Sequence, residues 1–398
     1  MPKEYSPFTP GVPVPIEFFV GRTEEIKKII GRVEKSVAQK SIERIFVSGE
    51  RGIGKSSLCS FARIIAEDRC SVIGLHVFLG GVNSLEEMAR RIFERLLQDS
   101  RGKPWFESVK SFLGNHVREV GLFGISLKFE ASEQDLSQAV SDFVPAIKNL
   151  LSKLNREKRG LVLILDDLNG LAASAQFANW IKSIVDEVAT SRESIPLTMI
   201  LVGLPERRRQ LIENQPSLDR VFDLIEIKRF SRKECDEFYQ KAFSKVSTTV
   251  SPEALDLFWR YSNGFPVFMH EIGDAAYKID QDNHIDKKDA SQGIMRAVQV
   301  IGVKYIEPKV TEAIRSEKYR DILRLIVKDE PKPTFTRKEV MSKLSESQKK
   351  VFDNFIQRMK KLGVIESAKS HGAGSYTFTS EIYTLFFWLQ TLPQNSKR

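Results

Sequence analysis

The sequence predicts an α/β fold, in which a mainly parallel sheet is flanked by helices and is followed by a helical segment and a small C-terminal module. Three observations predict it. Short apolar runs of strand length, such as Ile45–Val47, Leu161–Leu165 and residues 196–205, alternate with stretches of helical periodicity. A glycine-rich segment joins the first of these strands to a helix. From Tyr305 onward the pattern changes to closely spaced helices followed by two short strands.

The chain has 398 residues, enough for about two or three domains, and 41% of them are hydrophobic, so a sizeable core can form. No apolar run approaches the roughly 18 residues that cross a bilayer, and the N-terminus lacks the features of a secretory signal. We therefore expect a cytoplasmic protein with no membrane partner. Cys59, Cys70 and Cys235 show no metal-ligand spacing, so we expect buried thiols rather than zinc ligands or a disulfide.

The segment Gly49–Ser56 matches the pattern G-x-x-x-x-G-K-[ST] between a predicted strand and a predicted helix. Its glycines let the backbone turn tightly and direct N–H groups at phosphates, and the start of the helix adds its positive dipole end. Lys55 supplies a mobile charge for the β- and γ-phosphates, and the Ser56 hydroxyl is placed to ligate Mg²⁺. The pattern predicts a P-loop that binds ATP and Mg²⁺ through Gly49, Gly52, Ile53, Gly54, Lys55, Ser56 and Ser57.

Two acidic residues follow the buried run Leu161–Leu165, at the end of the strand where open α/β sheets bind their ligands. We expect Asp166 to hold the Mg²⁺ and Asp167 to orient the attacking water. The side chain of Asp167 is one carbon shorter than that of a glutamate, so we expect slow turnover. The alternative is a pair of surface aspartates after a core strand.

Further elements are expected along the chain. Helices are predicted at residues 23–36, 84–98 and 133–154, strands at 71–80 and 223–230, and a hairpin within 119–132. Residues 1–230 are predicted to form the P-loop core, with an insertion near 100–155 that we expect to contact a partner or another subunit. Residues 231–304 are predicted to form a helical lid, and residues 305–398 a separate C-terminal domain.

The C-terminal domain is predicted to be a winged helix. Helices are predicted at 319–328, at 335–344 with Thr336 as its cap, and from about 348 to 362, before strands at 364–367 and 376–379 that flank a wing, AKSHGAG. The chain has a formal net charge of +9, and residues 305–398 contribute +7 of it, with 18 Lys and Arg against 11 Asp and Glu. A basic module suggests a polyanion such as DNA. The predicted nucleic-acid contacts are Lys349, Lys350, Arg358 and Lys361, and the alternative is a winged helix that only packs against protein.

The segments FFVGR, GERGIGKSS, LILDD, ILVG and SNGFPVF, together with the terminal winged helix, resemble the STAND branch of the AAA+-type ATPases. This branch includes archaeal-type ATPases and relatives of replication initiators. The resemblance implies that Val20, Gly21 and Arg22 lie over the adenine. It also implies that the lid closes on the nucleotide through the Gly-x-Pro element that ends at Pro266.

The chain departs from its relatives at two positions and agrees with them at a third. The lid segment GFPVFMHE has no arginine for the γ-phosphate, which favours the STAND branch. The strand MILVG ends at Gly203, where many relatives carry a polar sensor. Arg220 stands where relatives present an arginine finger to a neighbouring subunit's nucleotide, which implies self-association; a local ion pair is the alternative.

Together these features predict an ATPase that hydrolyses ATP slowly with Mg²⁺ and uses its ATP or ADP state to switch conformation or assembly. A nucleic-acid partner is expected, and a protein partner of unknown kind. One alternative is a nucleotide-stabilised scaffold without meaningful turnover, and another is an initiator-like DNA remodeller or loader.

Overall fold

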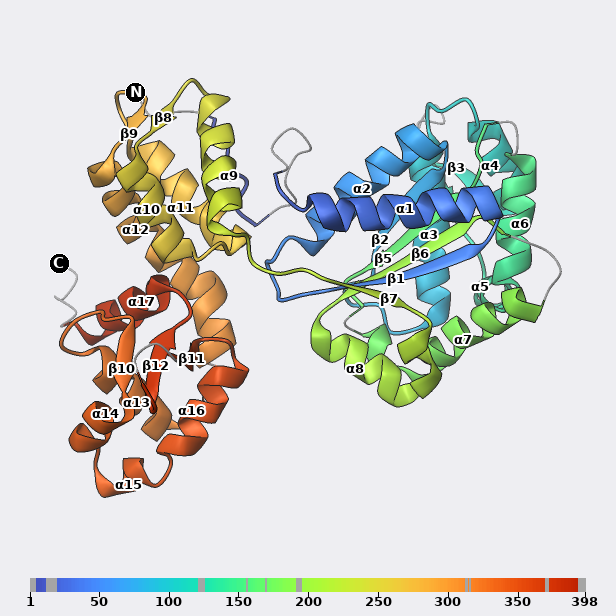
Figure 1. Cartoon of the computed structure of the whole chain (residues 1–398). Coiled ribbons are helices and arrows are strands. Elements are labelled where there is room, and N and C mark those ends of the chain that lie inside the picture. Colours follow the sequence, from blue (N-terminus) through green and yellow to red (C-terminus); the bar gives the residue numbers. More distant parts are fainter. Residues whose placement is uncertain are drawn as a thin grey trace. The chain divides into compact units, whose positions relative to one another are not determined.

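The computed structural model describes residues 5–11, 20–120, 126–154, 157–168, 170–190, 195–311, 314, 316–368 and 372–392 (Figure 1). The chain divides into two compact units. One is Arg22–Lys228, and the other combines Met1–Gly21 with Arg229–Arg398. None of the helices in these described ranges has the length and hydropathy needed to cross a membrane.

The unit Arg22–Lys228 is built on a five-stranded sheet in the order β2-β5-β6-β1-β7, in which every pairing is parallel. Its strands are β1 (Ile42–Ser48), β2 (Ile73–Phe78), β5 (Leu161–Asp166), β6 (Leu197–Gly203) and β7 (Asp223–Glu226). Because the strands are parallel, all their carboxyl ends lie at one edge of the sheet. The order places β6 between β1, which leads into the P-loop, and β5, which ends at Asp166.

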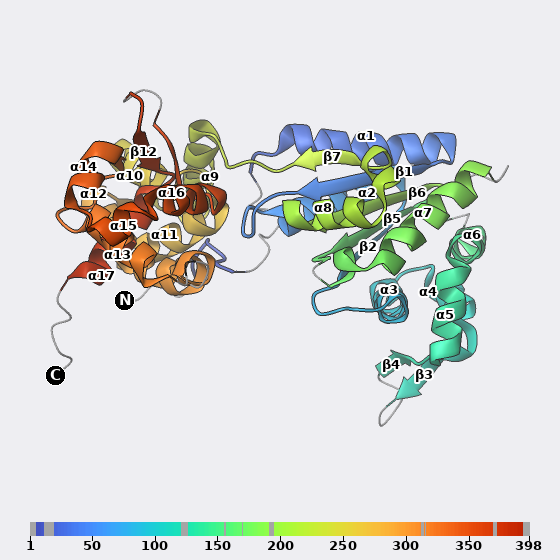
Figure 2. The ribbon, with the colours of Figure 1, turned by 90° about the horizontal axis from the view of Figure 1, so that it is seen from below.

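Helices cover both faces of this sheet (Figure 2). On one face lie α1 (Thr23–Gln39) and α2 (Lys55–Cys70). On the other face the main core includes side chains of α3 (Leu85–Ser100), α7 (Ala175–Thr190) and α8 (Pro205–Asn214). The sheet is therefore the middle of three layers, as its strands' nearly continuous burial requires. The unit also contains the short 3₁₀ turns η4 (Leu171–Ala173) and η5 (Pro216–Arg220).

The insertion between β2 and β5 contains the predicted hairpin, formed by antiparallel β3 (Val117–Val120) and β4 (Ser126–Phe129). It also contains α4 (Phe106–Leu113) and the 3₁₀ turn η2 (Gly114–His116). The single helix predicted at 133–154 is wrong, because the chain forms α5 (Glu133–Ser141) and α6 (Phe143–Lys153) with a break at Asp142. Pro145 explains the break, since its ring would clash with the carbonyl of Ser141 in a continuous helix.

The segment predicted to form the lid is helical, as its periodicity indicates, and the structure divides it into four main helices. They are α9 (Arg232–Ser244), α10 (Pro252–Ser262), α11 (Pro266–Ile279) and α12 (Lys287–Ile301), with a short parallel pair, β8 (Thr249–Val250) and β9 (His284–Ile285), and a π-helical continuation, η6 (Gly302–Thr311). Phe8 is buried against the rings of Phe238, Tyr239 and Phe243. This packing explains why the N-terminal segment groups with the lid, although the predicted core starts at residue 1.

The C-terminal module has the helix and strand order of a winged helix. Its elements are α13 (Glu317–Val327), β10 (Thr334–Thr336), α14 (Arg337–Lys343), α15 (Glu346–Lys349), α16 (Phe352–Lys361), β11 (Ile365–Ser367), β12 (Ser375–Phe378) and α17 (Glu381–Thr391). The strands form an antiparallel sheet in the order β10-β12-β11. Thr336 caps α14 as predicted, because its Oγ1 accepts a hydrogen bond from the Glu339 N–H.

Two predicted boundaries in this module differ from the structure. The helix predicted at 335–344 begins later, because Phe335 is buried in strand β10, where it pairs with Tyr376. The helix predicted at about 348–362 is divided, and α16 begins only at Phe352. Residues 369–371 of the predicted wing lie outside the described residues.

Candidate functional site

The loop between β1 and α2 has a backbone that requires glycine. Gly52 and Gly54 have φ values of 81° and 94°, in the left-handed region that residues with a side chain rarely adopt. A Cβ atom on Gly49 would lie 2.9 Å from a methyl carbon of Ile53 and 3.1 Å from the carbonyl oxygen of Ile227. The loop therefore turns tightly and leads directly into α2, whose first N–H groups lack helical acceptors.

Lys55 folds back over this loop. Its Nζ donates hydrogen bonds to the carbonyl oxygens of Gly49 and Glu50, each at 2.8 Å. Burial lowers the pKa of Lys55, and the carboxylates of Asp166 and Asp167 oppose that shift. The ammonium, the N-terminus of α2 and two acidic groups are therefore gathered at the carboxyl edge of the sheet.

Asp166 ends β5 and is 3% exposed. Its Oδ1 accepts a hydrogen bond from the Asp167 N–H at 2.8 Å, and its Oδ2 lies 2.9 Å from Nε2 of His76. Sequence reasoning did not single out His76, which lies in β2. The available signal was a single polar residue inside the otherwise apolar strand sequence IGLHVF.

Asp167 is exposed and has a φ of 60°, a left-handed conformation that Asp tolerates better than most residues. A Cβ atom on Gly80 would lie 2.8 Å from Oδ2 of Asp167. The carboxylate therefore packs against the backbone that follows β2, beside Asp166. The alternative of two surface aspartates does not describe Asp166, which is buried and hydrogen-bonded.

These groups fit a nucleotide with a bound Mg²⁺. The Ser56 hydroxyl in the first turn of α2 and the carboxylates of Asp166 and Asp167 are the oxygen ligands that Mg²⁺ prefers. Lys55 and the backbone N–H groups at the start of α2 suit phosphate oxygens. Ser57 follows in the same turn, and Ile53 is buried beneath the loop.

Arg22 contacts the loop from the side. It is 6% exposed, precedes α1 with a φ of 61°, and its Nη2 donates to the Ile53 carbonyl oxygen at 3.4 Å. The structure thus brings Arg22 together with the loop and the two aspartates. Val20, Gly21 and Pro266, the other predicted nucleotide contacts, belong to the other unit, where Pro266 begins α11.

The carboxyl end of β6 carries no polar side chain. Gly203 is the last residue of β6 and pairs with Ser48 in β1, so it lies at the same edge as the loop. Arg220 ends η5, is exposed, and makes no ion pair with any residue in the described ranges. The local ion pair considered for Arg220 is therefore absent from this part of the chain.

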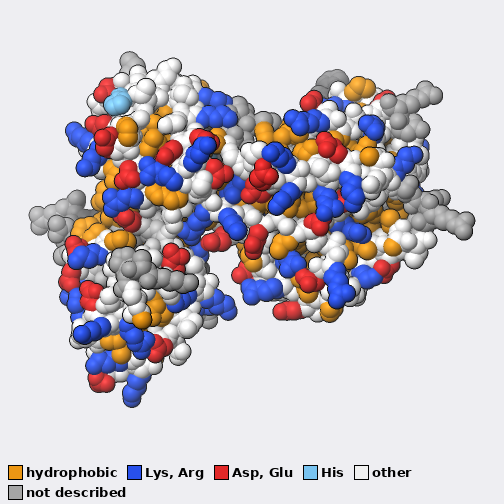
Figure 3. All heavy atoms as spheres, in the orientation of Figure 1, with side chains coloured by type: hydrophobic (Ala, Val, Ile, Leu, Met, Phe, Trp, Pro, Cys, Tyr) orange, Lys and Arg blue, Asp and Glu red, His pale blue; other side chains and the backbone are white. Residues whose placement is uncertain are grey.

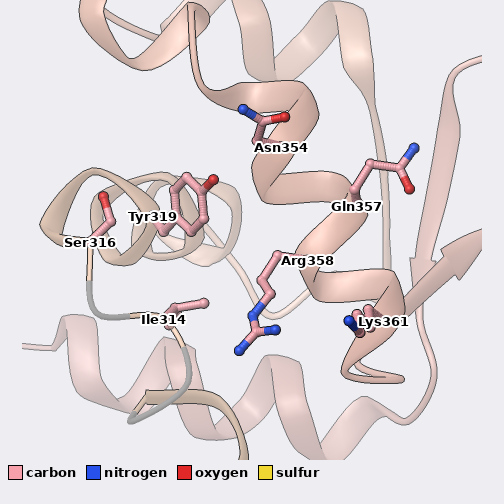
Figure 4. A pocket seen from close by; sticks show the side chains of 7 residues that line it. All are labelled: Ile314, Ser316, Tyr319, Asn354, Gln357, Arg358 and Lys361. Carbon is pink, nitrogen blue, oxygen red and sulfur yellow. The ribbon is translucent and has the colours of Figure 1, made fainter. Parts of the chain in front are cut away.

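The four predicted nucleic-acid residues fall into two groups. Arg358 and Lys361 of α16 line a hollow of about 490 Å³ together with Tyr319 of α13 (Figure 4). Lys349 belongs to α15, where it forms a 2.7 Å ion pair with Glu346, and Lys350 follows it. Neither Lys350 nor Lys361 forms an ion pair among the described residues.

Two other cations of the winged helix are paired with carboxylates. Arg337 pairs with Asp353, and Lys343 pairs with Asp329 at 2.8 Å. On the face that Figure 3 shows, basic and acidic side chains are interspersed over this module. Because Lys343 and Lys349 are paired with carboxylates, only some of the module's lysines are available to an anionic ligand.

The AAA ATPase domain family matches residues 19–200. The fold of the whole chain is similar to that of the Walker-type ATPase paby2304 of Pyrococcus abyssi, with a TM-score of 0.55 and 16% identity over 93% of this chain and 96% of that one. It is also similar to the ORC2 protein of Aeropyrum pernix, with a TM-score of 0.58 and 11% identity over 98% and 97% of the two chains. No curated protein sequence matches the chain significantly.

At these identities the two structures show a shared fold. The family match covers residues 19–200, which include the loop, β5 and both aspartates. The predicted resemblance to AAA+-type P-loop ATPases is confirmed, as is the fold class, a P-loop sheet followed by a helical lid and a winged helix. Residues 19–200 are therefore similar to the AAA ATPase domain family.

Proposed function

We propose that this chain binds Mg²⁺ and ATP at the P-loop and hydrolyses ATP slowly, using its nucleotide state to switch conformation or assembly. The observation that carries the proposal is the position of Lys55 on the carbonyl oxygens of Gly49 and Glu50, beside the carboxylates that end β5. Phosphoryl transfer needs little more from a protein than positioned groups and charge neutralisation. Lys55, Ser56 and Asp166 supply both.

Two features support slow turnover within one subunit. Asp167 is the proposed water-orienting base, yet it is short and packs against the loop at Gly80. The end of β6 at Gly203 offers no side chain that could orient a water. An added positive charge would have to come from elsewhere, and Arg220 of a second copy of this chain is the proposed source.

We further propose that the winged helix binds DNA through Lys349, Lys350, Arg358 and Lys361. The support is the net charge of +7 in residues 305–398 and the presence of two of these residues on one side of α16. The STAND branch remains the preferred assignment, because α11 contains no arginine.

A scaffold or adaptor without turnover is the second candidate. The exposure of Asp167 and the absence of a polar side chain at Gly203 favour it. An initiator-like DNA remodeller is a third, since the fold is shared with the ORC2 protein of Aeropyrum pernix, which was solved as ADPNP and ADP complexes. The missing lid arginine counts against it.

Titration with labelled ATP in the presence of Mg²⁺ tests the site. Lys55→Ala should abolish tight binding, because the phosphates lose their mobile cation. Asp167→Asn is the matched control at the same edge and should retain binding, since Asp166 still holds the metal. Unchanged affinity in Lys55→Ala would remove the P-loop from the mechanism.

A further inference from the structure

We propose that His76 is a positioning residue that holds the carboxylate of Asp166 in the orientation needed for the metal–nucleotide complex. The proposal rests on the proposed function and assigns a role to a residue outside the P-loop pattern. His76 lies in β2, is 4% exposed, and comes from the strand next to β5 in the sheet.

The register of the two strands places the side chains together. In the parallel pairing of β2 with β5, His76 lies opposite Ile164, and Phe78 lies opposite Asp166. Side chains two residues apart point to the same face of a sheet, so His76 and Asp166 share the face covered by α2. Their atoms Nε2 and Oδ2 are 2.9 Å apart, and both side chains are at most 5% exposed.

Both oxygens of Asp166 then have a donor. The Asp167 N–H donates a hydrogen bond to Oδ1, and Nε2 of His76 donates one to Oδ2. An ionised carboxylate can only accept hydrogen bonds, so the proton of His76 must be on Nε2. Two donors on different oxygens fix the rotation of the carboxylate group, which a single donor would leave free.

The surroundings of His76 keep its ring in this orientation. The ring stacks on that of Phe78, with centroids 4.7 Å apart and planes 20° apart. Cys59 of α2 is fully buried, and burial followed by the Asp166 charge raises its pKa well above the usual range. The thiol is therefore neutral and brings no competing charge to Asp166.

Packing alone does not require a histidine here. A buried polar group costs free energy unless it is hydrogen-bonded, and the neighbouring positions of β5 on the same face are filled by the aliphatic residues Val162 and Ile164. Without His76, the Asp166 carboxylate could turn toward Lys55, the cation whose burial-lowered pKa it partly restores. The Mg²⁺ would then lose part of the negative charge of Asp166, and the phosphates would lose part of the positive charge of Lys55.

The Mg²⁺ dependence of ATP binding tests this role. His76→Leu should raise the half-saturating Mg²⁺ concentration about tenfold or more, as loss of a ligand's hydrogen-bond partner commonly does. ATP affinity measured in EDTA should change by less than about twofold. His76→Gln should restore most of the Mg²⁺ dependence, because an amide can donate the same hydrogen bond.

Thr198→Val is the matched control. Thr198 is buried in β6 on the same face of the sheet, and its hydroxyl has no hydrogen-bond partner among the described residues. This variant removes a buried polar group without touching Asp166, so it should leave the Mg²⁺ dependence unchanged. An equal effect of Thr198→Val and His76→Leu would overturn the proposal.

A second measurement needs no metal. Nitrogen NMR of histidine-labelled wild-type protein without nucleotide should show one slowly exchanging Nε2–H tautomer, and the His76→Gln spectrum assigns it. An Nε2 of His76 that carries no proton would overturn the proposal. Failure of the wild type to bind ATP would reject the proposed function instead, and the tautomer would still report whether His76 holds Asp166.

Discussion

The buried side chain of His270 connects the N-terminal segment, at Phe8 and Thr9, to the lid. It lies in α11, is 5% exposed, and its ring contacts the edges of Phe8 and Phe238. Its Nδ1 accepts a hydrogen bond from the Thr9 N–H at 3.1 Å. Burial lowers the pKa of His270 to about 4, opposed by the nearby Asp274, so the folded protein keeps the ring neutral at neutral pH.

This pKa predicts a pH dependence of stability. The unfolded chain has the ordinary histidine pKa of about 6.5, so it binds more protons than the folded chain between about pH 6.5 and 4. The stabilisation is complete above pH 6.5 and is lost as the pH falls toward 4. From pH 7 to pH 5, His270 should lower the free energy of unfolding by about 2 kcal/mol.

Hydrogen exchange of α11 peptides along urea titrations at the two pH values measures this loss. His270→Gln should show a loss smaller by about 2 kcal/mol, because its amide does not titrate. The same pH dependence in His270→Gln and wild type would show that other groups cause it.

At the scale of elements, the strands of the sheet were predictable because their sequence signal is local. The continuous apolar run Leu161–Leu165, with two acidic residues after it, indicates a strand that is buried on both faces of the sheet. The division between α5 and α6 was missed because helical periodicity continues across Pro145, and only its ring geometry stops the helix. Strand β10 was missed because its pairing with β12 joins residues far apart in the chain.

The site shows the same division between local and distant signals. The loop Gly49–Ser56 and the acids after β5 were predictable from residue types at fixed spacing. The contact between His76 and Asp166 was not, because it depends on strand order and register. The contribution of Arg22 was predicted only through the resemblance, and its hydrogen bond to Ile53 appears only in the structure.

The proposed DNA binding of the winged helix can be tested on a single helix, α16. If Lys361 of α16 contacts a phosphate of duplex DNA, Lys361→Ala should reduce the slope of log affinity against log salt by about 0.9. Lys343→Ala is the matched control, because Lys343 is already neutralised by Asp329. Fluorescence anisotropy of the full chain, recorded between about 50 and 200 mM salt, measures both slopes.

Equal slopes for the two variants would contradict a phosphate contact at Lys361. Duplex binding that is absent, or that does not depend on salt, would favour a winged helix that packs only against protein.

At the scale of the whole molecule, the lid and the winged helix are joined by specific polar contacts within their unit. Arg260 at the end of α10 makes two 2.9 Å hydrogen bonds to Glu381 at the start of α17. Asn263, which follows α10, donates to the Thr379 carbonyl oxygen, and so does Arg229. A movement of the lid would therefore carry the winged helix with it, which gives the proposed nucleotide switch a route to the proposed DNA-binding surface.

Assembly is the other proposed output of the switch, and Arg220 is its test. A neighbour's arginine typically contributes about 10³-fold or more to NTP hydrolysis. If Arg220 completes the site of a second copy, Arg220→Ala should keep its ATP affinity but lose the gain from assembly. Mixing it with Lys55→Ala should restore partial activity, since each variant lacks a different half of the shared site. Arg209→Ala is the control, because Arg209 is exposed and pairs within α8 with Glu206.

The measurement that tests the account most directly is sustained Mg²⁺-dependent phosphate release per subunit as a function of protein concentration. The account predicts release above the Lys55→Ala background that rises with concentration, is unchanged in Arg209→Ala, and becomes independent of concentration in Arg220→Ala. Release no higher than in Lys55→Ala at any concentration would contradict it and leave a nucleotide-stabilised scaffold.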